Sequence, residues 1–225
     1  MSGVVERLTI GVEREQTTAL VYRAASGSSD ATLVLAHGAG AGQQSPFMAG
    51  FARGLAERGV DVLTFNFLYT EQRRRVPDRT PKLEACYRAA IAAAREQFAR
   101  DTTVIGGKSM GGRIATHLAA ADDADASGIA GVVLLGYPLH PPGKPDQLRA
   151  AHLPRIRVPM LVIQGERDTF GTPDELRPHL DAMAAEVRLH VIPRGDHSLT
   201  VRSRPAAETY TELADIAANF IAPTA

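Results

Sequence analysis

Residues 102–121, TTVIGGKSMGGRIATHLAAA, pass from a short apolar run into an Ala-rich segment through two pairs of glycines. The run TTVI is typical of a buried strand, and MGGRIATHLAAA is typical of a helix. Ser109 lies between them, in the pentapeptide Gly107-Lys108-Ser109-Met110-Gly111. We therefore expect a strand, a sharp turn and a helix, with Ser109 at the turn.

The alternation of apolar runs and helical segments extends on both sides of this stretch, and no 20–50-residue repeat interrupts it. Continuous apolar runs suit strands buried on both faces, so the pattern predicts a mostly parallel sheet covered by helices on both sides. An antiparallel strand pair and a polar loop (residues 26–30) are expected to precede it. The expected strands are residues 8–13, 18–23, 31–36, 60–67, 102–105, 131–135, 160–163 and 187–192, and the expected helices are residues 47–58, 82–100, 110–121, 173–184 and 206–221.

Composition excludes several classes of protein. The 225 residues carry 25 Lys and Arg against 25 Asp and Glu, a net charge of zero, which argues against nucleic-acid and polybasic membrane partners. The single cysteine, Cys86, excludes an intrachain disulfide and a Cys-rich zinc site, and we expect it to be a buried apolar residue. With no signal-peptide pattern and no apolar run of about 20 residues, we expect one cytoplasmic domain over residues 1–225.

The pentapeptide around Ser109 matches the Gly-x-Ser-x-Gly pattern of a nucleophile elbow. A sharp strand-to-helix turn lifts the serine hydroxyl out of the sheet, and the glycines permit the strained backbone and close packing. The start of the following helix directs free N–H groups at any oxyanion that forms. A plain Gly-rich loop is the alternative, but the strand before and the helix after favour Ser109 as a nucleophile.

A second Gly-rich loop, His37-Gly-Ala-Gly-Ala-Gly42, directly follows the expected strand at residues 31–36. It can turn the backbone N–H of Ala39 toward the elbow, so Ala39 and Met110 are the expected donors of an oxyanion hole. A phosphate-binding loop is the alternative, but the Gly-x-Gly-x-x-Gly spacing and a following Lys-Ser/Thr are both absent. His37 itself is expected to be structural.

Asp168 and His197 each follow an expected strand of the parallel sheet. Because ligands and reactive groups gather beyond the carboxyl ends of such strands, we expect both side chains on the same edge as Ser109. His197 would act as general base, and Asp168 would hold its tautomer and stabilise the imidazolium. The other histidines do not follow a strand in this way. Glu166, Asp174 and Asp196 are weaker alternatives for the acid. No pattern of ligand residues predicts a metal or a cofactor.

At these residues the sequence resembles the α/β-hydrolase superfamily from Ala31 to the end of the chain, including its chain order of Ser, Asp and His. The segments HGAGAGQQSPFM, FNFLYTEQRRRVPDR, GGKSMGGR, LHPPGKPDQLRAAHL and QGERDTFGTPDEL resemble a small capless branch. That branch holds testis-expressed protein 30, the hydrolase-like domain of NSL-complex subunit 3 and many bacterial hydrolases, and it is distantly similar to dienelactone hydrolases. The latter use a cysteine nucleophile where this chain has Ser109, so their substrate does not carry over.

The resemblance implies an α/β-hydrolase three-layer sandwich, with a mostly parallel central sheet, an N-terminal antiparallel strand pair and a Ser-Asp-His triad. Residues 137–158, where relatives insert a helical cap, are too few and too Pro-rich for a cap domain, so the site should be shallow. The loop at residues 68–81 would form a second wall. There Tyr69, Arg73, Arg74 and Arg75 are a candidate substrate rim for a carboxylate or phosphate, although a solvated basic loop is the simpler interpretation.

The sequence thus predicts a serine hydrolase that cleaves a small or exposed carboxylic ester or thioester through an acyl-enzyme. The principal alternative is a non-catalytic protein-interaction module that keeps the hydrolase scaffold, because a fold does not establish a function. A peptidase or amidase is less expected, since no domain for selecting peptides fits in this length. We expect a small-molecule substrate, with no nucleic acid or membrane partner; oligomeric state and protein partners are left open.

Overall fold

The computed structural model describes residues 5–24, 30–100, 102–121 and 128–222, and most of the loop expected at residues 26–30 lies outside them. Eight strands form one sheet in the order β1-β2-β4-β3-β5-β6-β7-β8. β1 pairs antiparallel with β2, β2 pairs antiparallel with β4, and every later pair is parallel. The strands are β1 (Glu6–Val12), β2 (Glu15–Tyr22), β3 (Ala31–Ala36), β4 (Asp61–Phe65), β5 (Thr102–Lys108), β6 (Ile129–Leu135), β7 (Met160–Gly165) and β8 (Val187–Ile192).

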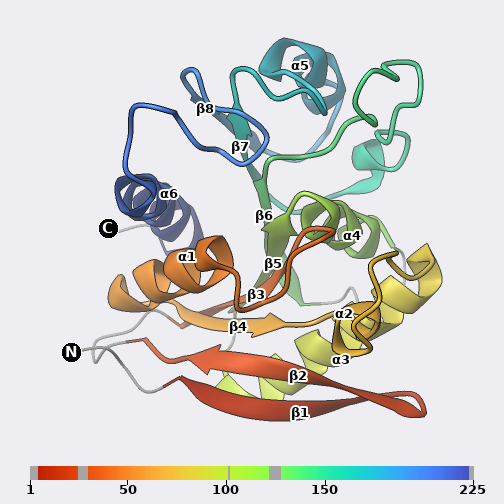
Figure 1. The fold of residues 1–225 in the computed structure, drawn as a ribbon, viewed down its shortest axis with the longest axis vertical. Coiled ribbons are helices and arrows are strands. Elements are labelled where there is room, and N and C mark those ends of the chain that lie inside the picture. The colour runs from red at the N-terminus through yellow and green to blue at the C-terminus, as the bar shows by residue number, and fades with distance from the viewer. Residues whose placement is uncertain (1–4, 25–29, 101, 122–127, 223–225) are drawn as a thin grey trace.

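Helices cover both faces of the sheet (Figure 1). Two apolar cores result, because successive side chains of the buried strands point to opposite faces. Leu33 and Leu35 of β3 pack with α1 and α6, whereas Val34 and Ala36 pack on the face of α3, α4 and α5. The helices are α1 (Pro46–Glu57), α2 (Leu68–Glu71), α3 (Thr80–Phe98), α4 (Met110–Ala119), α5 (Pro173–Asp181) and α6 (Ala206–Ile221). The predicted three-layer fold is confirmed.

Local sequence signals account for where the helices begin. Ser45 caps α1 by accepting a hydrogen bond from the N–H of Met48, and Pro46 occupies the first helical turn. Thr172 and Glu175 form a reciprocal capping box at the start of α5. α4 begins directly after Ser109 without a side-chain cap, which leaves its first N–H groups free to bind an anion.

The glycines around Ser109 permit a close approach between α4 and the sheet. A β-carbon on Gly111 would lie 2.4 Å from the carbonyl oxygen of Ala36, and one on Gly106 would lie 2.3 Å from the carbonyl oxygen of Val133. Both contacts are with backbone atoms of neighbouring strands, which cannot move aside. The Gly-rich composition of this segment is therefore a packing requirement of the strand–turn–helix unit.

The structure differs from the prediction at one turn and adds two short elements. The first hairpin turns at Glu13 and Arg14 rather than at residues 14–17, and Glu13 takes a left-handed φ of 53°. Two short elements were not predicted: α2, in the loop after β4, and η1 (Leu153–Arg155), between β6 and β7. Both elements are too short to show the helical spacing of apolar residues that a sequence prediction depends on. In the described part of the chain no helical cap follows β6, and no helix is both long and apolar enough to span a membrane.

Candidate active site

Ser109 lies at the sharp turn between β5 and α4, with φ of 51° and ψ of −114°. Such a backbone is strained for a residue with a side chain, at a cost of about 1–3 kcal/mol, and it persists only when the surroundings enforce it. Here the N–H of Ser109 donates to the carbonyl of Leu135 on β6 at 3.0 Å, and its own carbonyl accepts from the N–H of Arg113 on α4 at 3.0 Å. The turn therefore holds the hydroxyl clear of the sheet.

His197 reaches Ser109 from the loop that follows β8. Its Nε2 lies 2.8 Å from the Ser109 hydroxyl oxygen. The loop is a tight turn in which the Asp196 carboxylate accepts hydrogen bonds from the N–H of Ser198 at 2.8 Å and of Thr200 at 3.1 Å. Asp196 thus shapes the loop and does not contact the imidazole.

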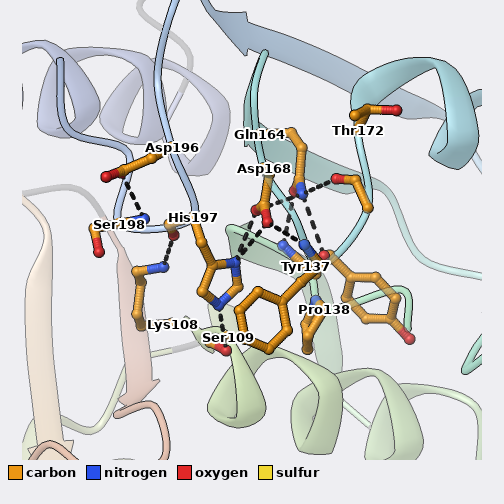
Figure 2. A network of polar contacts seen from close by, with 12 residues as sticks. Lys108, Ser109, Tyr137, Pro138, Gln164, Asp168, Thr172, Asp196, His197 and Ser198 are labelled. Atoms are coloured by element: carbon orange, nitrogen blue, oxygen red, sulfur yellow. Dashed lines mark hydrogen bonds and ion pairs between the residues drawn. The ribbon is translucent and has the colours of Figure 1, made fainter. Parts of the chain in front are cut away.

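Asp168 completes a hydrogen-bonded chain from the loop after β7 (Figure 2). Its two carboxylate oxygens lie 2.8 and 3.0 Å from Nδ1 of His197, and its side chain is fully buried. The N–H of Phe170 donates to the same carboxylate at 2.8 Å. Since a carboxylate can only accept, Nδ1 carries the proton toward Asp168, and Nε2 is left to accept the proton of the serine hydroxyl.

The loops that carry Asp168 and His197 are tied to each other through backbone contacts. The N–H of Arg167 donates to the carbonyl of Gly195 at 2.8 Å. A β-carbon on Gly165 would lie only 2.2 Å from the carbonyl oxygen of Asp196, so glycine is required where β7 ends. These contacts hold the loop of Asp168 against the loop of His197, although the two residues are 29 positions apart in the sequence.

Two residues around Asp168 and His197 were not predicted. Gln164, fully buried at the end of β7, donates from Nε2 to Asp168 at 2.8 Å and to the carbonyl of Gly171 at 2.7 Å, while its Oε1 accepts from the N–H of Tyr137 at 2.8 Å. Phe170 stacks on the imidazole of His197, with ring centroids 4.0 Å apart. The sequence signal for Gln164 was a polar amide that ends an otherwise apolar strand.

Lys108, whose role the sequence left open, lies between the serine turn and the histidine loop. Its ammonium donates to the backbone carbonyl of His197 and lies 5.8 Å from the centre of the Phe47 ring. Burial lowers the pKa of Lys108 to about 8, although the carboxylates of Asp168 and Asp196 oppose the shift.

The Gly-rich loop after β3 passes beside the serine. A β-carbon on Gly38 would lie 3.5 Å from the β-carbon of Ser109. His37 anchors the loop, since Nδ1 lies 2.8 Å from the Gly38 carbonyl and Nε2 accepts from the N–H of Phe67 at 3.1 Å. Burial lowers the pKa of His37 to about 4, so it is neutral and structural. In the described part of the chain the N–H groups of Ala39 and Met110 donate to no protein acceptor.

The rim candidates surround a separate hollow of about 520 Å³, bounded on one side by residues 40–42 of the Gly-rich loop. Tyr69, Thr70 and the three arginines 73–75 form the other side. Tyr69 is only 2% exposed, and its hydroxyl lacks a hydrogen-bond partner among the described residues. Arg74 pairs with Asp78 at 2.5 Å, whereas no ion pair of Arg73 or Arg75 is found in the described segments.

Several of the alternative acids and histidines have partners of their own away from Ser109. Glu166 accepts from the N–H of Arg194 at 2.6 Å. His117 lies 3.0 Å from Glu84, and His152 lies 2.8 Å from the Thr116 hydroxyl. Across the described residues no cluster of histidine, cysteine and acidic side chains is suited to hold a metal ion.

Comparison with known proteins identifies the family. The sequence model described as "Alpha/beta hydrolase domain" matches residues 29–224, and the chain belongs to this family. Among solved structures, a dienelactone hydrolase from Anabaena variabilis is 20% identical, with a TM-score of 0.77 and 97% of each chain covered. An alpha-beta serine hydrolase homologue from Coxiella burnetii is 17% identical, with a TM-score of 0.77 and coverage of 96% of this chain and 97% of that one.

A third similar structure is a serine hydrolase without a lid from Xanthomonas campestris. It is 19% identical, with a TM-score of 0.73, and the match covers 98% of this chain and 97% of that one. At these identities the structural matches show the fold alone, and they agree with the absence of a cap from the described part of this chain.

Proposed function

We propose that the protein is a serine hydrolase that cleaves a carboxylic ester or thioester through a covalent acyl-enzyme. His197 takes the proton of Ser109 as the serine oxygen attacks the acyl carbon, and the N–H groups of Ala39 and Met110 stabilise the oxyanion. Collapse of the tetrahedral intermediate breaks the bond to the leaving group, which receives the proton from His197. Water then attacks the acyl-enzyme with His197 again as base, which releases the acid and restores Ser109.

The observation that carries the proposal is the unbroken hydrogen-bonded chain from Ser109 through His197 to Asp168. Both links are 2.8 Å: the first is short enough for His197 to take the serine proton, and the second is short enough for Asp168 to hold the imidazole. The strained backbone at Ser109 adds support, because strain of this kind is retained where a side chain must be presented in one geometry. The start of α4 has no side-chain cap, and we expect its free N–H groups to bind the negative charge of the intermediate.

The test is labelling of the purified protein with a fluorophosphonate probe, with turnover of p-nitrophenyl acetate measured in parallel. We expect Ser109→Ala to abolish labelling and to lower turnover by about 10³-fold or more. Ser198→Ala is the matched control, because Ser198 is exposed one residue beyond His197 and is expected to leave both signals unchanged. If folded wild-type protein is neither labelled nor active, the proposal is wrong and an interaction module becomes the better description.

The hollow beside the Gly-rich loop supports a substrate rim on the same edge of the sheet. We propose that Arg73 and Arg75 contact a carboxylate or phosphate on the substrate, with the buried hydroxyl of Tyr69 as a hydrogen-bonding group. A guanidinium without a carboxylate partner is free to bind such a group, whereas Arg74 is already neutralised by Asp78. We therefore expect the enzyme to prefer substrates whose acyl group carries a negative charge over neutral ones.

A further inference from the structure

We infer that Lys108 is a positioning residue for the general base, whose ammonium holds the backbone of His197 and thereby joins the nucleophile's strand to the base's loop. The inference rests on the proposed function of Ser109 and His197. It concerns a residue that acts through His197 and does not contact the reacting atoms.

The first support is where Lys108 lies in the chain. It is the last residue of β5 and directly precedes Ser109, so its backbone shares the strained turn of the nucleophile. Its side chain crosses to the loop after β8 and donates to the carbonyl oxygen of His197 (Figure 2). One residue therefore contacts the loop of the base and is covalently adjacent to the nucleophile.

The second support is that His197 is held at two points on opposite ends of the residue. Asp168 holds the imidazole at Nδ1, and Lys108 holds the main chain at the carbonyl oxygen. Among the described residues, Lys108 is the protein donor to that carbonyl. The first contact opposes rotation of the imidazole and the second opposes displacement of its backbone, and Nε2 lies 2.8 Å from the Ser109 hydroxyl oxygen.

The third support is that the surroundings leave space for this contact. Gly136, directly after β6, has a left-handed φ of 68°, and a β-carbon there would lie 2.8 Å from both the Lys108 ammonium and the His197 carbonyl oxygen. The absence of a side chain at residue 136 allows the ammonium and the carbonyl to meet. The Phe47 ring of α1 also lies near the ammonium, 5.8 Å from ring centre to Nζ.

The fourth support is energetic. A partly buried ammonium loses part of its hydration, and its hydrogen bond to His197 only partly replaces that loss. The charged and titratable groups that face it are Asp168, Asp196 and His197. An apolar side chain of the same length would pack here without a desolvation cost, so a stabilising role alone does not explain a lysine at this position.

The test compares Lys108→Met with the wild type and with Lys144→Met, which removes a lysine charge from an exposed loop. We expect Lys108→Met to lower kcat for p-nitrophenyl acetate about 10- to 100-fold, as misplacement of a catalytic group does, with KM changed less than about twofold. Its thermal midpoint should stay within about 4 °C of the wild type. Lys144→Met should change none of these values.

The pH profile separates positioning from simple packing. Because the pKa of Lys108 is lowered to about 8, the wild-type kcat should decline above about pH 8 as the ammonium loses its proton. That decline should be absent from Lys108→Met, whose kcat is low throughout. The inference is wrong if Lys108→Met keeps the wild-type kcat, or if its activity falls only in proportion to the folded fraction.

A measurement without turnover keeps the inference separate from the proposed function. In ¹⁵N-histidine-labelled protein, Lys108→Met should shift and broaden the imidazole signals of His197 and leave those of His190 on β8 unchanged. Unchanged His197 signals would overturn the inference, even if the wild type proves inactive. If Lys108→Met does not fold, Lys108→Gln takes its place; if neither folds, Lys108 is a stability residue and the inference is wrong.

Discussion

Replacement of Gln164 by leucine leaves an apolar side chain of roughly similar size but removes the amide that links the loop of Asp168 to β6. The Nε2 of Gln164 donates to Asp168 and to the carbonyl of Gly171, and its Oε1 accepts from the N–H of Tyr137. It also lies 3.2 Å from the carbonyl of Tyr137, which keeps a second donor in Leu139 at 3.0 Å. In the described structure the N–H of Tyr137 and the carbonyl of Gly171 have no other partner.

The cost follows from those two backbone groups. Each buried and unsatisfied polar group costs about 1–3 kcal/mol, so Gln164→Leu should lower the free energy of unfolding by about 2–6 kcal/mol. Natural domains are stable by about 5–15 kcal/mol, so the loss is a large fraction of the total, and the variant stays folded where the wild-type stability exceeds the loss. Asp168 also loses one of its donors, and we expect kcat to fall about 10-fold in the fraction that stays folded.

Urea unfolding followed by far-UV circular dichroism measures the first effect, and p-nitrophenyl acetate turnover measures the second. Gln97→Leu is the control, because its amide is exposed and its one contact, with Glu6 at 3.3 Å, is on the surface. That variant should change the free energy of unfolding by less than about 0.5 kcal/mol. A loss below about 1 kcal/mol in Gln164→Leu would refute the assigned role of Gln164.

Three further predictions follow from the site and its supports. Gly111→Ala should lower the thermal midpoint and abolish fluorophosphonate labelling, because its β-carbon would lie 2.4 Å from the carbonyl oxygen of Ala36. Burial lowers the pKa of His37 to about 4 in the folded protein, against about 6.5 in the unfolded chain, so the unfolded chain binds the proton first as pH falls. About 3 kcal/mol of the free energy of unfolding should therefore be lost between about pH 6.5 and pH 4. Urea unfolding across that range should show a smaller loss in His37→Gln. Replacement of both Arg73 and Arg75 by glutamine should raise KM about 10-fold for p-nitrophenyl hemisuccinate and leave KM for p-nitrophenyl butyrate unchanged.

Each of these predictions has its own control or refuting result. Gly11→Ala tests whether any added methyl group is harmful, since a β-carbon at Gly11 has no neighbour within 4 Å. For His37, identical acid sensitivity of the variant and the wild type would contradict the burial argument. For the arginine rim, equal changes in KM for the charged and the neutral substrate would indicate a solvated basic loop.

The order of strands and helices was predictable because the chain alternates short apolar runs with amphipathic segments. The boundaries of β8 and α6 match the sequence prediction, since each is a strongly patterned segment between polar residues. α2 and η1 were missed because one turn of helix carries no apolar period. The sequence predicted the first hairpin turn at residues 14–17, but it lies at Glu13 and Arg14, because the residues after it have high strand propensity and extend β2.

The proposed site was predictable only in part. Ser109, Asp168 and His197 each follow a strand, and the carboxyl ends of parallel strands lie on one edge of the sheet, so their juxtaposition could be expected before any coordinates. Gln164, Phe170 and the contact made by Lys108 could not, because nothing in their local sequence identifies the groups that they meet.

The sequence by itself determined the class of fold and the residue types at the strand ends, because hydrophobic periodicity and glycine turns are local properties of the chain. Only the tertiary structure decided which groups lie within hydrogen-bonding distance. Lys108 meets His197 across 89 positions of sequence, and Gln164 meets the N–H of Tyr137 across 27. Such contacts depend on how the loops beyond β5, β6, β7 and β8 pack together, and that packing depends on the whole sheet.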